Sequence, residues 1–239
     1  MPPEAYELTL SGPGKNSLAT ALMQGILAEV RAAAGRPLLL TGAGDAFSAG
    51  LNLREVAALD PHGMEQFLCL LDDVIDALYG YPGPTVAAVN GHAIAGGCVL
   101  VLCCDVRIAV NDARVRIGLN EVPLGLEFPP KILALARRRV PAHALQRVVL
   151  EGGLHDPATA LSLGLVDELA DDVVAHARAC LERLGAHPRA VYAATKRTLR
   201  GGTLDLSEEQ RRHFREHIVP AWCAPETKER VRAALDRRR

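Results

Sequence analysis

Two glycine-bearing turns lie where backbone amides could bind an anion. The segment AFSAGLNL, residues 46–53, precedes an apparent helix that starts near Leu53, and residues 90–105, NGHAIAGGCVLVLCCD, turn through Gly96 and Gly97 into an apolar helix. Amides at a helix start lack an intrahelical partner and lie at the positive end of the helix dipole. Small residues also let a ligand approach the backbone closely. Each turn alone could be mere tight packing, but two such turns could converge on one oxygen.

A single carboxylate follows these turns in an apolar setting. Glu121 lies in IGLNEVPLGL, residues 117–126, just before a turn that contains Pro123. Apolar surroundings raise the pKa of a carboxyl group, which suits it to accept and return protons near neutral pH. Without the preceding turns, a surface glutamate or a helix cap would explain this residue equally well.

Together, the three segments resemble the crotonase (enoyl-CoA hydratase/isomerase) superfamily in their order and separation. The resemblance extends from GPGKNSL, residues 12–18, to LSLGLVDEL, residues 161–169, and weakens beyond. It implies an α/β fold, the crotonase-like ββα superhelix, with layered β-sheets and surrounding helices. It further implies a core domain over residues 1–170 and a C-terminal helical region over residues 171–239 that serves trimerisation and site closure.

The resemblance also implies roles for particular residues. The backbone N–H groups of Ala49 and Gly96 would hold the thioester carbonyl of an acyl-CoA, each contributing about 3 kcal/mol to an enolate-like transition state, and Glu121 would be catalytic. Further residues are expected to contact the substrate, namely Ser48, Leu51, Gly97, Val99, Leu124 and Glu127, while Arg54 and Lys196 are candidate contacts to the CoA phosphates. His92 lies near the second turn and could contact the substrate, although a structural role is the simpler explanation.

Departures from the family pattern reduce the number of reactions that the resemblance allows for this chain. Hydratases of the family have a second Glu where this chain has Val99, whereas enoyl-CoA isomerases keep only the later Glu and resemble the AGGC and IGLNE segments. We therefore expect Glu121 to move a proton from C2 to C4 of a 3-enoyl-CoA. Glu127 lies six residues after Glu121, near but not at the spacing of a second carboxylate in some dienoyl-CoA isomerases. The alternatives are hydration, decarboxylation of an acyl-CoA, or a catalytically silent CoA-binding subunit.

Apolar spacing predicts the elements that position these residues. Residues 16–34 and 64–78 carry apolar side chains at helical spacing, and Asn16 or Ser17 could cap the first of these helices. Strands are expected at 38–41, 85–89, 106–110 and 114–117, a helix at 97–104, and mostly helices from residue 128 onward. This alternation is typical of a layered α/β fold. We find no solenoid-type repeat and no linker between domains.

Composition limits the partners. The chain has 239 residues, 49% of them hydrophobic, and a formal net charge of −1, so it offers no basic face for nucleic acid. Six cysteines without CxxC spacing predict no metal site, and no cofactor is expected beyond the CoA of the substrate. The longest apolar stretch ends at Asp105, well short of a membrane span, which favours a cytoplasmic protein without membrane contact. The resemblance implies a homotrimer or hexamer.

Overall fold

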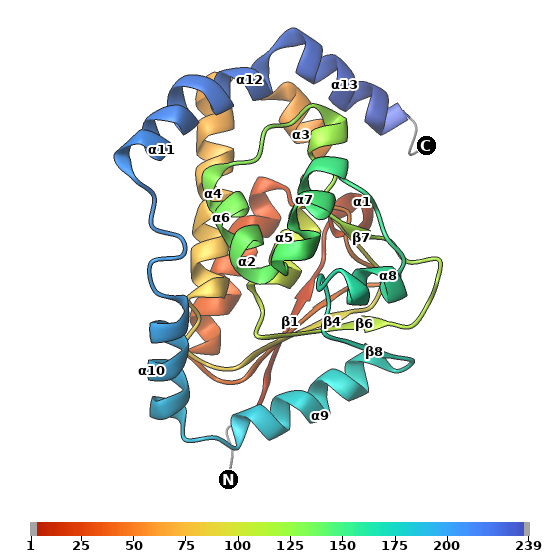
Figure 1. Cartoon of the computed structure of the whole chain (residues 1–239), viewed down its shortest axis with the longest axis vertical. Helices are drawn as coiled ribbons and strands as arrows, with labels where there is room; N and C mark the ends of the chain where they lie inside the picture. The colour runs from red at the N-terminus through yellow and green to blue at the C-terminus, as the bar shows by residue number, and fades with distance from the viewer. Residues whose placement is uncertain (1–3, 237–239) are drawn as a thin grey trace.

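Two parallel β-sheets form the centre of the molecule in the computed structural model, which describes residues 4–236 (Figure 1). The larger sheet contains, in spatial order, β1 (Tyr6–Leu10), β2 (Leu38–Gly42), β4 (Thr85–Val89), β6 (Val106–Val110) and β8 (Glu168–Ala170). The smaller sheet contains β3 (Ala46–Ser48), β5 (His92–Ile94) and β7 (Ile117–Gly118).

The chain builds the two sheets together by repeating a strand-strand-helix unit. β2 and β3 lead to α3, β4 and β5 lead to α5, and β6 and β7 lead to the short 3-10 helix η1. Each unit adds one parallel strand to each sheet, with Leu38 opposite Thr85 and Val86 opposite Val106 in the larger one. The predicted α/β fold with ββα units is therefore confirmed, and its repeat was not visible in the sequence.

Helices cover both faces of the larger sheet and continue to Asp236, the last described residue. Their bounds are α1 (Pro13–Asn16), α2 (Thr20–Ala33), α3 (Leu53–Ala58), α4 (Pro61–Tyr79), α5 (Gly96–Cys103), η1 (Val122–Leu124), α6 (Pro130–Arg139), α7 (Ala142–Gln146), η2 (Arg147–Glu151), α8 (Pro157–Ser162), α9 (Val173–Gly185), α10 (Arg189–Arg200), α11 (Glu208–His213), η3 (Phe214–Ile218), α12 (Val219–Cys223) and α13 (Pro225–Asp236).

Every β4 residue is buried, because helices pack on both sides of this strand. Val86 and Ala88 contribute to a small core with Cys180 and Leu181 of α9, whereas the alternating residues Ala87 and Val89 belong to the main core. Side chains on the two faces of β4 therefore pack into two different hydrophobic cores. This double burial explains why neither face of β4 carries a charged side chain.

Two local predictions were wrong. The predicted helix over 16–34 begins at Thr20, and its N-cap Ala19 has no capping side chain. Asn16 is buried instead, and its side-chain amide donates to the carbonyl oxygens of Ala43 and Ala46, at 2.9 and 2.8 Å. The strand predicted over 114–117 is the two-residue β7, because Asp112 and Arg114 fold into a turn before it.

The C-terminal helices form an arch above α4 and α3, seen at the top of Figure 1. α12 packs against α4, and α13 packs against α3 and η1. α9, by contrast, packs against the larger sheet, so residues 171–236 do not behave as one layer. The division at residue 170 stays a prediction. No helix within residues 4–236 has both the length and the apolarity to cross a membrane.

Candidate active site

The turn after β3 directs one backbone amide away from its neighbours. The Leu18 amide donates to the Gly50 carbonyl at 2.8 Å, and the Asn52 amide donates to the Leu18 carbonyl at 3.0 Å. In this parallel bridge, Leu51 directs its own N–H away from Leu18. Within residues 4–236 that N–H has no hydrogen-bond acceptor. Leu51 therefore presents a free donor at this turn.

The predicted donor at the same turn is not free. The Ala49 amide donates to the Lys15 carbonyl at 3.0 Å. The assignment of the first oxyanion amide to Ala49 is therefore wrong in this structure, because an engaged N–H cannot also bind a ligand without breaking that bond. The free amide lies two residues later, at Leu51.

The second turn begins α5 through an unusual backbone conformation. Ala95 has φ 50° and ψ −119°, a region that costs a non-glycine residue about 1–3 kcal/mol and is concentrated at functional sites. Its N–H donates to the Gly118 carbonyl and its carbonyl accepts from Val99, at 2.8 and 3.0 Å. The next amide, that of Gly96, lies in the first turn of α5 and has no intrahelical acceptor.

The two turns are in close contact. A Cβ atom added to Gly50, where φ is +86°, would lie 2.6 Å from the Ile94 carbonyl oxygen and 3.4 Å from the Gly96 nitrogen. A Cβ on Gly96 would lie 3.2 Å from Leu51 Cδ2. Glycine at these positions therefore lets the turns bearing the Leu51 and Gly96 amides approach one another.

Glu121 brings an isolated carboxyl group to the same place. The residue follows β7, and its backbone carbonyl accepts from the amides of Leu124 and Leu126, both at 3.0 Å. Its side chain is 4% exposed, and within residues 4–236 its Oε2 atom has no hydrogen-bond partner. Burial raises the pKa of Glu121 to about 8, because the charged form is poorly solvated there.

A narrow inner cavity contains this carboxyl group. The residues that line the inner cavity are Ala49, Leu51, Leu53, Ala95, Asn120, Glu121, Leu124, Leu126 and Trp222. Leu51 and Leu124 were both predicted to contact substrate and do line this space. Asn120 and Trp222 were missed, because Trp222 comes from a helix far along the chain and Asn120 seemed only a neighbour of Glu121.

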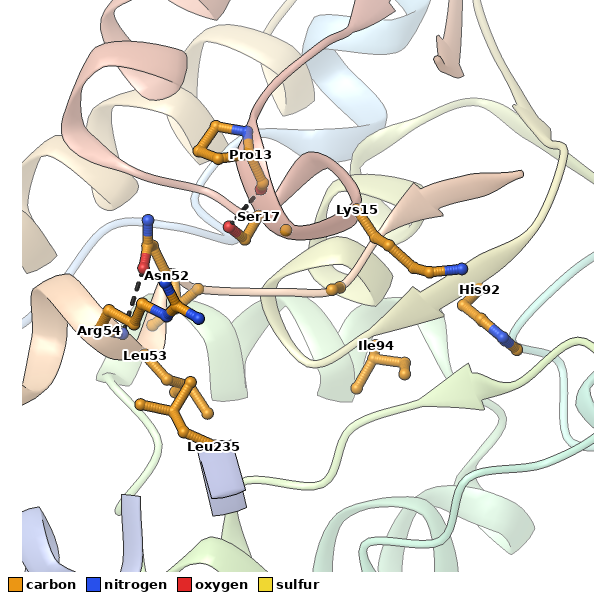
Figure 2. A pocket seen from close by; sticks show the side chains of 12 residues that line it. Pro13, Lys15, Ser17, Asn52, Leu53, Arg54, His92, Ile94 and Leu235 are labelled. Atoms are coloured by element: carbon orange, nitrogen blue, oxygen red, sulfur yellow. Dashed lines mark hydrogen bonds between the residues drawn. The ribbon is translucent and has the colours of Figure 1, made fainter. Parts of the chain in front are cut away.

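An outer cavity of about 490 Å³ adjoins the inner one (Figure 2). Ala49, Leu51 and Leu53 line both cavities. The other residues of the outer cavity are Pro13, Gly14, Lys15, Ser17, Asn52, Arg54, His92, Ile94 and Leu235. The sequence missed Leu235, which α13 contributes from the end of the described chain.

Basic side chains lie around the outer cavity. Figure 2 shows Arg54 beside Leu235 at one end, and Lys15 and His92 at the other. Asn52 caps α3 by accepting from the Arg54 amide at 3.1 Å, as the sequence allowed. Lys15 pairs with Asp45 at 2.8 Å, and both side chains are more than half exposed. Burial and the charge of Lys15 lower the pKa of His92. This part of the site suits an anionic ligand.

Three residues that were predicted to contact substrate are instead buried in the structure and do not line the cavities. Ser48 Oγ donates to the Asn16 carbonyl at 2.8 Å. A Cβ on Gly97 would lie 2.4 Å from the Ser48 carbonyl oxygen, so only glycine fits there. Val99 is wholly buried in α5 within the main core. Ser48, Gly97 and Val99 line neither cavity.

Two other predictions do not fit the structure. Lys196 is 7% exposed, and its Nζ donates to Asp105 and to the Gly83 carbonyl, at 2.8 and 2.9 Å, beside a separate cavity. The assignment of Lys196 to CoA phosphate is wrong for this chain as it stands. Glu127 turns its half-exposed carboxylate to His213 at 2.7 Å and lines neither cavity, so its expected substrate contact is also wrong.

One C-terminal helix, α12, contributes Trp222 to the wall of the inner cavity. Trp222 Nε1 in α12 donates to the Glu127 carbonyl at 2.9 Å, which fixes the indole beside Leu126 at the cavity wall. Lys228 Nζ in α13 donates to the Leu59 carbonyl at 2.6 Å. Within residues 4–236, no three His, Cys, Asp or Glu side chains gather as a metal ion would require.

The sequence of this chain is similar to those of enoyl-CoA isomerases and hydratases. The profile of the Enoyl-CoA hydratase/isomerase family matches residues 5–237. Enoyl-CoA delta isomerase 1, mitochondrial, of Mus musculus is 34% identical over 167 residues, which cover 69% of this chain and 58% of that protein. The probable enoyl-CoA hydratase echA17 of Mycobacterium avium is 33% identical over 195 residues, which cover 79% of this chain and 75% of that protein.

The fold agrees with the sequence matches. The crystal structure of human mitochondrial delta3-delta2-enoyl-CoA isomerase superposes with a TM-score of 0.92 at 26% identity, covering 98% of this chain and 93% of that chain. The sequence match nevertheless spans little more than half the length of the mouse isomerase. On the profile match over nearly its whole length, the chain belongs to the enoyl-CoA hydratase/isomerase family.

Proposed function

We propose that this chain isomerises a 3-enoyl-CoA to a trans-2-enoyl-CoA, with Glu121 as the only proton carrier. The observation that carries the proposal is the position of the Glu121 carboxyl group. It lies buried in a cavity whose walls include Leu51 and Ala95, the residues next to the two glycine-rich turns. A carboxyl group with this burial can exchange protons near neutral pH.

The Leu51 and Gly96 amides would hold the thioester oxygen. Leu51 N–H has no acceptor within residues 4–236, and Gly96 N–H lies at the start of α5. Two preorganised donors stabilise an enolate oxygen more than the carbonyl from which it forms, and each is worth about 3 kcal/mol. The helix dipole of α5 adds to the same effect.

The proton chemistry then requires one carboxylate. With the thioester oxygen held, the C2 proton of a 3-enoyl-CoA becomes acidic, and Glu121 removes it to give a dienolate. The same carboxyl group returns the proton at C4, and the double bond moves to C2. The anionic form of Glu121 is the base, so the rate should rise as the pH approaches the pKa of about 8.

The outer cavity would receive the CoA part of the substrate. Lys15, Arg54 and His92 line it, and cationic side chains bind phosphate through charge-assisted hydrogen bonds. The inner cavity is too narrow for an acyl chain as it stands, so Leu126 and Trp222 would shift on binding. Assembly into a homotrimer or hexamer and a cytoplasmic location stay predictions, and the name of the mouse relative assigns that protein to mitochondria.

A second candidate is the hydratase reaction, since hydratases are among the similar proteins. The burial of Val99 in the core disfavours the usual pair of carboxylates. A catalytically silent CoA-binding subunit is disfavoured, because a buried carboxyl group without a hydrogen-bond partner lowers stability and would have no function in such a protein. A panel of 3-enoyl, 2-enoyl and malonyl-type CoA thioesters, with products separated by chromatography, tests the choice. Fastest turnover of the 3-enoyl substrate supports isomerisation, and turnover of none supports the silent subunit.

A further inference from the structure

Three apolar side chains of the inner cavity take no part in the proton chemistry. Leu124, Leu126 and Trp222 line the inner cavity and not the outer one. In the proposed reaction the CoA part of the substrate occupies the outer cavity, and the carbons next to the thioester lie at Glu121. The alkyl chain beyond C4 therefore has these three side chains as its surroundings.

The space beside these side chains is small. The inner cavity offers about 20 Å³ to the centre of a water molecule, and a single water molecule needs roughly 10–15 Å³ measured in this way. A methylene group takes up about as much room as a water molecule, so the cavity as it stands holds about one or two carbon atoms. Even the shortest 3-enoyl chain requires Leu126 and Trp222 to shift slightly, and each further carbon requires a larger shift.

Burial and a hydrogen bond hold Trp222 in place. Its side chain is 2% exposed, and Nε1 donates to the Glu127 carbonyl at 2.9 Å. The residue belongs to α12, which packs against α4 and α13 in the arch (Figure 1). A displaced indole loses this hydrogen bond and its packing in the main core. Cores are packed too densely to accept such a large side chain elsewhere without strain.

The turn that carries Leu126 also has little room to move. The Leu126 amide donates to the Glu121 carbonyl at 3.0 Å, which ties this wall of the cavity to the carboxyl-bearing residue. Gly125 has a φ of +74°, and a Cβ atom there would lie 2.6 Å from Nη1 of Arg230 in α13. A displacement of the turn therefore disturbs either the packing of α13 or the position of Glu121.

We propose that Trp222 limits the length of the acyl chain and restricts this enzyme to short-chain 3-enoyl-CoA thioesters, of about four to six carbons. The inference rests on the proposed function, because that function places the reacting carbons at Glu121. It adds the substrate class, which the proton chemistry leaves open. Trp222 is a specificity-determining residue in this account, since it contacts the end of the chain and not the reacting atoms.

The energetics of burial give the size of the effect. Each methylene group that is buried in an apolar site strengthens binding about fourfold, so an enzyme with an open acyl cavity prefers longer chains. A cavity closed by an indole reverses this trend, because each added carbon must displace the ring. Replacing Trp222 with alanine removes the ring and leaves room for about two further methylene groups or more.

The test measures kcat/KM for isomerisation of 3-enoyl-CoA thioesters of four, six, eight and ten carbons. Wild type, Trp222→Ala and Phe214→Ala are compared. Phe214 provides the matched control, because it is a buried aromatic residue of the same arch that lines neither cavity. Trp222→Phe keeps more of the packing and serves as a second variant if alanine unfolds the protein, which circular dichroism detects.

We expect the wild-type kcat/KM to fall about tenfold or more from six to ten carbons. The ratio of the ten-carbon to the six-carbon value should rise about tenfold or more in Trp222→Ala, since two buried methylene groups contribute about fourfold each. In Trp222→Phe the same ratio should rise about threefold or more, because a smaller ring leaves part of this room. In Phe214→Ala it should stay within about threefold of wild type.

The outcomes separate this inference from the proposed function. A wild-type kcat/KM that stays level or rises with chain length overturns the inference and leaves the isomerisation in place. An equal change of the ratio in the Trp222 and Phe214 variants assigns the effect to lost packing and overturns the role of Trp222. Absence of isomerisation at every length overturns the proposed function. The dissociation constants of saturated acyl-CoA thioesters of the same lengths, measured by isothermal titration calorimetry, then decide the limit on chain length through the same ratios.

Discussion

Replacing Glu121 with glutamine should stabilise the protein most at high pH. Burial raises the pKa of Glu121 from 4.5 to about 8. Below pH 4.5 both the folded and the unfolded chain carry the proton, and burial of the acid has no pH-dependent cost. Between pH 4.5 and 8 the unfolded chain releases the proton while the folded chain keeps it, so stability falls as the pH rises.

The size of the effect follows from the pKa. A difference of about 3.5 between 4.5 and 8, at about 1.36 kcal/mol for each pKa unit, gives about 5 kcal/mol above pH 8 as an upper figure. Glutamine does not titrate, so the stability of Glu121→Gln minus that of wild type should grow by this amount from pH 4 to pH 9. Urea unfolding of both proteins at several pH values measures it. A difference that does not depend on pH would refute the reasoning that burial controls this carboxyl group.

Three further predictions concern other parts of the site. Arg54→Ala should raise the KM for an acyl-CoA several-fold with little change for the matching acyl-pantetheine, because Arg54 lines only the outer cavity; equal effects on both substrates would contradict this. Gly97→Ala should lower the free energy of unfolding by about 1–3 kcal/mol, since its Cβ would lie 2.4 Å from the Ser48 carbonyl oxygen, and urea titration checks it. Lys196→Met should cost about 3 kcal/mol of stability by breaking a buried ion pair with Asp105, while a rise in the KM for acyl-CoA without loss of stability would restore Lys196 as a phosphate contact.

Local patterns in the sequence predicted strands β2, β4 and β6 of the larger sheet and the buried carboxyl group of Glu121, whereas the ββα fold was implied by the family resemblance. Strand 85–89 is buried throughout and mostly apolar, strand 106–110 is apolar apart from Arg107, and Glu121 is the only charged residue of the segment 117–126. The spacing of apolar residues did not reveal the second strands β3 and β5, because each is only three residues long. Such short strands have no periodicity of their own and form through pairing with distant partners.

Errors at the site have the same physical origin. Whether the Ala49 or the Leu51 amide is free depends on Lys15 and Leu18, which lie more than thirty residues earlier in the chain. The sequence alone suggests that Lys196 is an exposed basic residue, because its buried ion pair with Asp105 joins positions far apart in the chain. Trp222 and Leu235 reach the cavities through the packing of α12 and α13, which no spacing in the sequence specifies.

The most direct test of the central claim compares two glutamates. Purified wild type, Glu121→Gln and Glu127→Gln are assayed on one 3-enoyl-CoA, with circular dichroism to verify the fold. Glu127 is the matched control, because it lies six residues away and its half-exposed carboxylate pairs with His213. We predict that Glu121→Gln lowers kcat by about 100-fold or more, the usual contribution of a general acid-base group, and that Glu127→Gln stays within about threefold of wild type. A Glu121→Gln enzyme that keeps most of the wild-type rate would contradict the account.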